Sequence, residues 1–257
     1  IVDFTVDKYR SLCKAIVDNG YESLKIVDGV EKAVIPEYAI LLRHDVDRKP
    51  QNALELAKVE HEYSFGSTYY FRMVPASFNP KIIKEISELG HEIGFHYECL
   101  SKTKGDYQEA IMLFAKELEI FRNLADIRTI AMHGSPFSPY NNLDLWKTYQ
   151  FSEYGIVGEA YLSIDYRKFS YFTDTGRTWE RNKHNLRDFV NQDEFVKKPI
   201  VSTNDLIDLI ENRDIKKLCI QSHPERWAGG VWEWGLSYGT DQFVNLIKSF
   251  IRRIRDK

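Results

Sequence analysis

The stretch Ile40-Leu-Leu-Arg-His-Asp-Val-Asp47 decides the fold, because within it an apolar strand runs out into two carboxylates. Side chains on a strand point alternately to opposite faces, so Arg43, Asp45 and Asp47 share one face. Paired carboxylates at the end of a buried strand are costly unless a cation, a metal or a shared proton offsets their repulsion. The stretch therefore predicts a functional site at a strand end. The alternative is a surface turn in which Asp-Val-Asp caps the helix after Pro50.

Helical and extended patterns alternate along the rest of the chain. Apolar residues at helical spacing predict helices over residues 7–20, 50–63, 80–89, 106–124, 204–212 and 241–255, the last packing against the remainder. Short apolar runs predict strands over residues 40–47, 66–73, 91–96, 127–133 and 217–223. Shorter strands are expected at 154–159, 161–165 and 170–174, a hairpin-like stretch before Pro36, and a surface insertion at 181–198. Strands that alternate with helices imply an α/β fold with a mainly parallel sheet.

The later strands have two different faces. One face is apolar, as at Ile93 and Phe95, and is expected to meet the helices. The other face carries small residues and histidines, as at Gly94 and His96, and the strands over 127–133 and 217–223 repeat this pattern. Parallel strands that each end in an inward polar residue indicate a closed or nearly closed barrel whose strand ends converge on one site.

Composition narrows the class of protein. The 257 residues contain no linker or repeat, so we expect one domain over residues 1–257 with a motif-bearing core at about 38–227. With a net charge of −3, the protein lacks the positive electrostatic field that nucleic-acid binding needs, which argues against a DNA- or RNA-binding protein. Cys13, Cys99 and Cys219 are odd in number and have no C-x-x-C spacing, which favours a reducing compartment over a disulfide framework. Neither a membrane span nor an export signal is predicted, so a cytoplasmic location is expected, with the oligomeric state open.

Histidines end three of the predicted strands. His96, His133 and His223, together with Asp45 and Asp47, supply enough ligands and proton carriers for a metal-assisted hydrolase. Each histidine alone is weak support, because a lone histidine at a strand end is more often a structural hydrogen-bonding group. His91 precedes His96 by five residues and is expected to pack or hydrogen-bond on the opposite face.

Four motifs resemble those of the NodB-type polysaccharide deacetylases of carbohydrate esterase family 4. The motifs are Arg43-His-Asp-Val-Asp47, Gly90-His-Glu-Ile-Gly-Phe-His96, Thr173-Asp-Thr-Gly-Arg-Thr-Trp179 and Ile220-Gln-Ser-His223, and they follow the family's order from about Ile40 to Trp227. The resemblance implies a distorted (β/α) barrel, a divalent metal such as Zn²⁺, and hydrolysis of an N-acyl group, usually N-acetyl, on an amino sugar. It also implies Asp45 as general base, Asp47 and His96 as metal ligands, His223 as general acid oriented by Asp174, and Trp179 as a lining of the sugar pocket.

The chain departs from the family pattern at Leu100, where members usually have a second histidine. His133 is the expected third ligand, because it ends a neighbouring strand, and Glu98 is the second choice. Arg43, on the face of Asp45, is expected to replace the arginine that normally pairs with the catalytic aspartate. Glu98, Ser135 and Tyr140 are expected to contact the substrate.

The leading hypothesis is thus a metal-dependent amidase that acts on an N-acylated sugar or polysaccharide in surface-polysaccharide, O-antigen or glycolipid metabolism. A first alternative is hydrolysis of a cyclic or small-molecule amide on the same barrel, with or without a metal. A second alternative is a catalytically silent relative that binds glycan only. The presence together of Asp45, Asp47 and His223 argues against the silent relative, because a binding module needs neither a base nor an acid.

Overall fold

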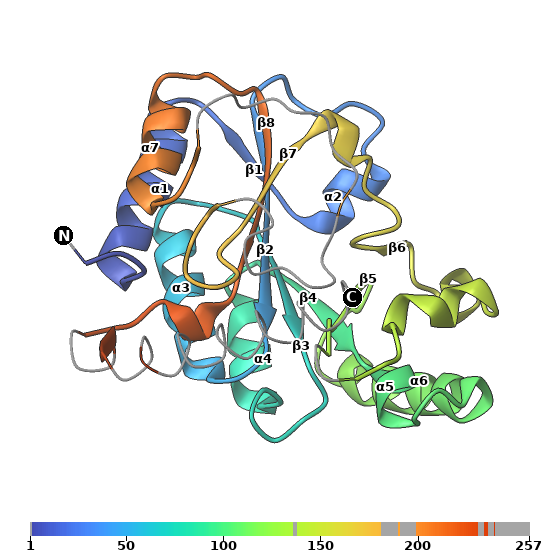
Figure 1. Ribbon diagram of the computed structural model, residues 1–257. Coiled ribbons are helices and arrows are strands. Elements are labelled where there is room, and N and C mark those ends of the chain that lie inside the picture. The colour runs from blue at the N-terminus through green and yellow to red at the C-terminus, as the bar shows by residue number, and fades with distance from the viewer. Residues whose placement is uncertain are drawn as a thin grey trace, which may run out of the picture.

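The computed structural model describes residues 2–135, 138–180 and 199–230, with residues 190, 234, 235 and 239 in addition. Its centre is one parallel sheet (Figure 1). The strands are β1 (Glu22–Leu24), β2 (Ala39–Val46), β3 (Thr68–Phe71), β4 (Glu92–Tyr97), β5 (Thr129–Met132), β6 (Gly158–Glu159), β7 (Ser170–Thr173) and β8 (Lys217–Ser222). They lie in the order β6-β5-β4-β3-β2-β8-β7, and β1 pairs with the beginning of β2. This confirms an α/β fold with a parallel sheet.

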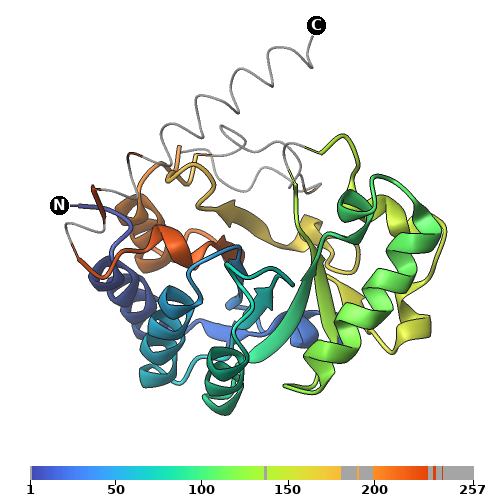
Figure 2. The same ribbon diagram turned by 90° about the horizontal axis from the view of Figure 1, so that it is seen from below.

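The helices lie on the convex face of the sheet, apart from the second, which packs on the concave side against Leu41 and Ile164. They are α1 (Val6–Asp18), α2 (Ile26–Glu31), α3 (Pro50–Glu62), α4 (Pro80–Glu88), α5 (Cys99–Lys102), α6 (Tyr107–Arg122) and α7 (Thr203–Glu211). Short 3-10 turns cover Asn142–Lys147, Phe151–Tyr154, Tyr166–Lys168 and Pro224–Arg226. Seen from below, α1, α3, α4 and α6 follow the outside of the curled sheet (Figure 2). Side chains cap α1, α4, α6 and α7 at Thr5, Asn79, Asp106 and Ser202, which accept hydrogen bonds from the first turns.

The two faces of the strands bury different layers. Ile93 and Phe95 pack in the apolar layer beneath α3, α4 and α6, as the alternation predicts. On the concave side, Tyr70, Ala131 and Cys219 form a smaller inner layer. The strand β2 is buried along its whole length, and the N-cap of α3 is Lys49, without a side-chain capping bond. The alternative of a surface turn that caps α3 is therefore wrong.

The sheet curls into a half-barrel, which is consistent with the predicted (β/α) barrel-like fold but is not closed among the described strands. Among the described strands, β6 and β7 are the two edges, and no ladder joins them. The edge β6 has only 2 residues, and the segment 161–165, predicted as a strand, forms turns. The chain therefore leaves the sheet where another strand would be needed to close it.

Other differences lie in the weakly patterned segments. The stretch before Pro36 is not a hairpin: β1 runs parallel to β2, and α2 follows it. The predicted helix over 241–255 and nearly all of the insertion at 181–198 lie outside the described residues. Within the part of the chain that is described, no helix combines the length and the apolar composition needed to cross a membrane.

Candidate metal centre

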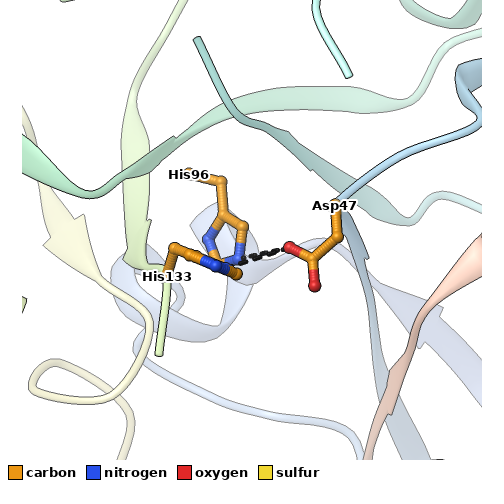
Figure 3. A group of neighbouring side chains, drawn as sticks. All are labelled: Asp47, His96 and His133. Atoms are coloured by element: carbon orange, nitrogen blue, oxygen red, sulfur yellow. Dashed lines mark ion pairs between the residues drawn. The ribbon is translucent and has the colours of Figure 1, made fainter. Parts of the chain in front are cut away.

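Three side chains converge at the carboxyl ends of β2, β4 and β5. Asp47 follows β2, His96 lies near the end of β4 and His133 follows β5, and their donor atoms all lie within 4.8 Å of one another. Asp47 Oδ1 is 3.0 Å from His133 Nδ1 and 3.6 Å from His96 Nε2 (Figure 3). The ends of parallel strands meet at one edge of a sheet, which brings residues far apart in the sequence together here.

The donor atoms suit a divalent cation. His96 Nδ1 lies 2.9 Å from the carbonyl oxygen of Ala131, so Nδ1 carries the hydrogen and Nε2 keeps its lone pair on the side of Asp47. Asp47 Oδ1 is buried and, among the described residues, accepts no hydrogen bond of good geometry. A buried carboxylate oxygen without a donor is costly unless a cation compensates it. One carboxylate and two imidazoles are a common ligand set for zinc, and Asp47, His96 and His133 therefore form a possible metal site.

The backbone holds His133 in this position. Its N–H donates to the carbonyl oxygen of Tyr97 at 2.8 Å, and its own carbonyl accepts from Asn142 Nδ2, also at 2.8 Å. Asn142 is fully buried and also accepts from the N–H of Ser101. The segment after β5 is thus tied to α5, which follows β4.

Glu98 lies outside this group of ligands. Its carboxylate accepts from Arg72, with 2.8 Å between Nη2 and Oε2 and 3.2 Å between Nε and Oε1. The position of the expected second histidine, Leu100, lies on α5 and is 1% exposed in the apolar layer. A side chain at that position faces the core, and His133 stands beside Asp47 and His96 instead.

Asp45 lies beside the metal centre and is clamped on both oxygens. Arg43 donates from Nε to Oδ1 at 2.9 Å and from Nη2 to Oδ2 at 2.7 Å, and Gln221 Nε2 donates to Oδ2 at 2.6 Å. Asp45 Oδ2 is also 3.6 Å from His96 Nε2. Burial alone would raise the pKa of Asp45, but Arg43 and His96 outweigh it and hold the pKa well below its usual range. Asp45 is therefore an anion in the folded protein.

Tyr161 completes the clamp. Arg43 Nη2 also donates to Tyr161 Oη at 2.8 Å, and the Arg43 guanidinium lies 4.3 Å from the centre of the Tyr161 ring. The sequence reasoning did not select Gln221 or Tyr161 for the site. Alternation places Gln221 on the inward face of β8, so a search for polar inward residues would have found it. Tyr161 lies in an irregular turn, where no periodic signal exists.

His223 forms a second polar group with Asp174 at the end of β8. His223 Nδ1 lies 2.7 Å from Asp174 Oδ1, and the His223 N–H donates to Oδ2 at 2.9 Å. Arg226 and Trp227 also donate to Asp174, at 2.6 and 3.0 Å. Burial and Arg226 act to lower the pKa of His223, yet Asp174 raises it above its usual value. The imidazole is therefore held by Nδ1 and favours the protonated form.

Three residues expected to contact the substrate are not members of the possible metal site. Trp179 is 1% exposed and packs against Phe4 and Trp227, with its Nε1 donating to Thr203. It belongs to the layer beneath the helices and supports Trp227 and not a sugar pocket, so that expectation is corrected. Ser135 lies two residues after His133, and its backbone is in the left-handed region, with φ 40°. The Tyr140 ring covers Gly105, beyond α5.

Comparison with models of known protein families gives no match, and comparison with curated proteins gives none either. The case for a function therefore rests on the residues of the site and their geometry.

Proposed function

We propose that this protein is a metal-dependent amidase of the NodB type, which removes an N-acyl group, foremost N-acetyl, from an amino sugar. One observation carries the proposal: Asp47, His96 and His133 form a possible metal site with Asp45 at its side, and the His223–Asp174 pair lies at the ends of β8 and β7. Strand β2 delivers Asp45 and Asp47, and β8 pairs with β2 along six residues before it reaches His223. The four motifs that resemble the deacetylases contain all of these residues except His133.

Two residues carry the two proton transfers of amide hydrolysis, Asp45 as the base and His223 as the acid. When bound by Asp47, His96 and His133, a divalent cation such as Zn²⁺ supplies Lewis acidity to a substrate carbonyl and to water. Asp45, kept ionised by Arg43 and Gln221, accepts the proton of the attacking water. His223 is held through Nδ1 by Asp174, so its Nε2 is the position from which a proton reaches the leaving amine. An amine leaves poorly until it is protonated, which gives His223 the role of general acid.

Two features favour this function over its alternatives. A glycan-binding relative needs no buried carboxylate held ionised beside two imidazoles, and that arrangement is costly to bury. A hydrolase that works without a metal needs no donor set in which a buried carboxylate oxygen faces two imidazoles. The choice of an N-acylated sugar as substrate rests on the resemblance of the motifs.

A turnover assay with metal removal tests the proposal. We expect the Zn²⁺-loaded protein to release acetate from an N-acetylglucosamine oligosaccharide, and a chelator to abolish this until Zn²⁺ is restored. Asp45→Asn should lower kcat by about 10²- to 10⁴-fold. Asp18→Asn, on the exposed end of α1, is the control and should leave kcat unchanged. Turnover that persists after complete metal removal would favour the metal-free amidase, and metal binding without turnover would favour the binding relative.

The third ligand has its own test by metal affinity. His133→Gln should weaken Zn²⁺ binding by about 100-fold or more, because one of three ligands is lost. Glu98→Gln should change the affinity by only a few-fold, because Arg72 engages the Glu98 carboxylate. Competition titration against a chromophoric chelator measures both. The reverse ranking would place the metal beside Glu98.

A further inference from the structure

Behind the site, on the helix side of β2, lies a buried polar cluster that the proposed chemistry does not use. The other residues on this face of β2, Ile40, Leu42 and Val46, are apolar, whereas His44 is polar and fully buried. His44 Nε2 lies 2.6 Å from Glu60 Oε1, and its Nδ1 lies 3.1 Å from Ser222 Oγ. Both ring nitrogens are therefore engaged, one on α3 and the other on β8.

The position of these contacts links the cluster to the site. His44 and Ser222 are paired residues in the β2–β8 ladder, and each directly precedes a residue of the proposed chemistry, Asp45 or His223. The Ser222 hydroxyl thus links the end of β8 to β2 one residue before His223. The N–H of His223, one residue further on, donates to Asp174 and fixes the imidazole.

Glu60 anchors this series of hydrogen bonds in the core. It is 0% exposed and accepts from Ser67 Oγ at 2.6 Å and from Tyr69 Oη at 2.7 Å, besides its contact with His44. The Tyr69 ring stacks on His44 with 4.3 Å between centroids and an interplanar angle of 21°. An apolar residue would fill the same volume without burying a carboxylate, and buried ionic groups add little net stability. The cluster is therefore better explained by the precision of placement that it provides.

We propose that Glu60, His44 and Ser222 are positioning residues, which lock the carboxyl ends of β2 and β8 together and so fix the distance between Asp45 and His223. This inference rests on the proposed function, since it assigns the two groups to one reaction. All three residues lie on the helix side of the sheet, behind the proposed metal ligands. They act through the backbone of the neighbouring residue on each strand.

The same cluster supplies matched controls. Ser67 and His91 are also buried and also contact Glu60 Oε2, at 2.6 Å and 3.6 Å, but they precede β3 and β4 and so lie at the opposite ends of their strands from the site. Ser222→Ala can be compared with Ser67→Ala, and His44→Gln with His91→Gln. Each pair removes the same chemical group at similar burial and differs in the end of the sheet that it affects.

Steady-state kinetics and amide hydrogen exchange on the full-length, Zn²⁺-loaded protein test the proposal. Ser222→Ala and His44→Gln should lower kcat by about tenfold or more with KM nearly unchanged, because a small misplacement of catalytic groups is costly. Exchange at the His223 N–H should become faster in both. Ser67→Ala and His91→Gln should lower thermal stability by a similar amount but leave kcat within about twofold and exchange at His223 unchanged.

Two results would overturn the inference. One is full kcat and unchanged exchange at His223 in Ser222→Ala, and the other is an equal loss of kcat in both members of a pair. If His44→Gln fails to fold, the serine pair decides, because it removes only a hydroxyl. A wild-type protein without amidase activity would instead defeat the proposed function, and hydrogen exchange at His223 would then decide the inference alone.

Discussion

At the scale of single residues, the Arg43–Asp45 pair is the most demanding feature of the site. Both side chains are almost fully buried, at 0% and 2% exposure. Removing charges from water costs several kcal/mol per ion. The bidentate contact, the bond from Gln221 to Asp45 and the bond from Arg43 to Tyr161 offset part of that cost. Arg43 Nη1, buried without a hydrogen-bond partner among the described residues, adds to that cost. The pair keeps Asp45 ionised at the expense of stability.

Removing one partner should therefore cost more than removing both. Arg43→Met leaves Asp45 buried as an anion that lacks its cation, and we expect a loss of about 3–5 kcal/mol in the free energy of unfolding. The double substitution Arg43→Met/Asp45→Asn should recover about 1 kcal/mol or more of that loss. Urea unfolding in the presence of a chelator measures both.

An exposed ion pair provides the control. Lys216 and Glu37 lie 2.6 Å apart with more than half of each side chain exposed, so Lys216→Met should leave the free energy of unfolding almost unchanged. If the losses at Arg43 and Asp45 simply add, the buried pair does not behave as a coupled unit.

The sequence predicted the site residues that lie on regular strands. Alternation alone placed Asp45, Asp47 and His96 inward, and the end of a neighbouring strand selected His133. Trp179 was misplaced, because a motif gives no information on which layer a tryptophan packs in. Glu98 was considered as a ligand because the pattern cannot reveal that Arg72, distant in the sequence, engages it.

At the scale of elements, β4 depends on a glycine that makes room for the inner layer. A Cβ atom on Gly94 would lie 2.2 Å from the Tyr70 ring and 3.0 Å from the carbonyl oxygen of Thr129. Tyr70 has little freedom to move away, since its hydroxyl is 2.7 Å from Thr129 Oγ1 and its ring lies beneath the Arg43 guanidinium. Gly94 therefore permits the close packing beneath the Arg43–Asp45 pair.

We expect Gly94→Ala to destabilise the protein by about 1–3 kcal/mol through overpacking. Gly230→Ala is the control, because a Cβ there meets no described residue within 4 Å, and its effect should stay within about 0.5 kcal/mol. Thermal unfolding of the two variants makes the comparison. A neutral Gly94→Ala would mean that the inner layer can rearrange around the methyl group.

The helices and strands that the sequence predicted are those with a clear hydrophobic period. The helices α1, α3, α4, α6 and α7 follow the predicted ranges, because each has one apolar stripe and a clear start signal. The strands β1 and β6, with 3 and 2 residues, are too short for a period to appear. Of these two strands, β6 is an edge of the sheet, so the extent to which the sheet closes could not be read from the pattern.

At the scale of the whole molecule, the buried carboxylate of Glu60 makes stability depend on pH. Burial acts to raise its pKa, but His44 and His91 lower it from 4.5 to about 2. The unfolded chain therefore takes up a proton at Glu60 at a higher pH than the folded protein does. The contribution of Glu60 is complete above the unfolded pKa and is lost as the pH falls toward the folded value.

The free energy of unfolding should thus decrease as the pH falls from about 4.5 to about 2, with at most about 3 kcal/mol due to Glu60. Glu60→Gln is less stable at neutral pH but should lack this part of the decrease. Urea unfolding of both proteins at a series of pH values isolates the difference. Parallel curves for the two proteins would show that Glu60 titrates alike in the folded and unfolded chains.

The order of the strands also determines when the site can assemble. Although β8 is the last strand of the described sheet along the chain, it lies between β2 and β7, so its docking joins His44 to a serine 178 positions away. Such distant contacts form late, since closing a long loop must precede any gain from it. Until then, the open edge of β2 is free to pair with other chains. Docking of β8 therefore covers that edge of β2 and, in the same step, brings the end of β8 beside the end of β2.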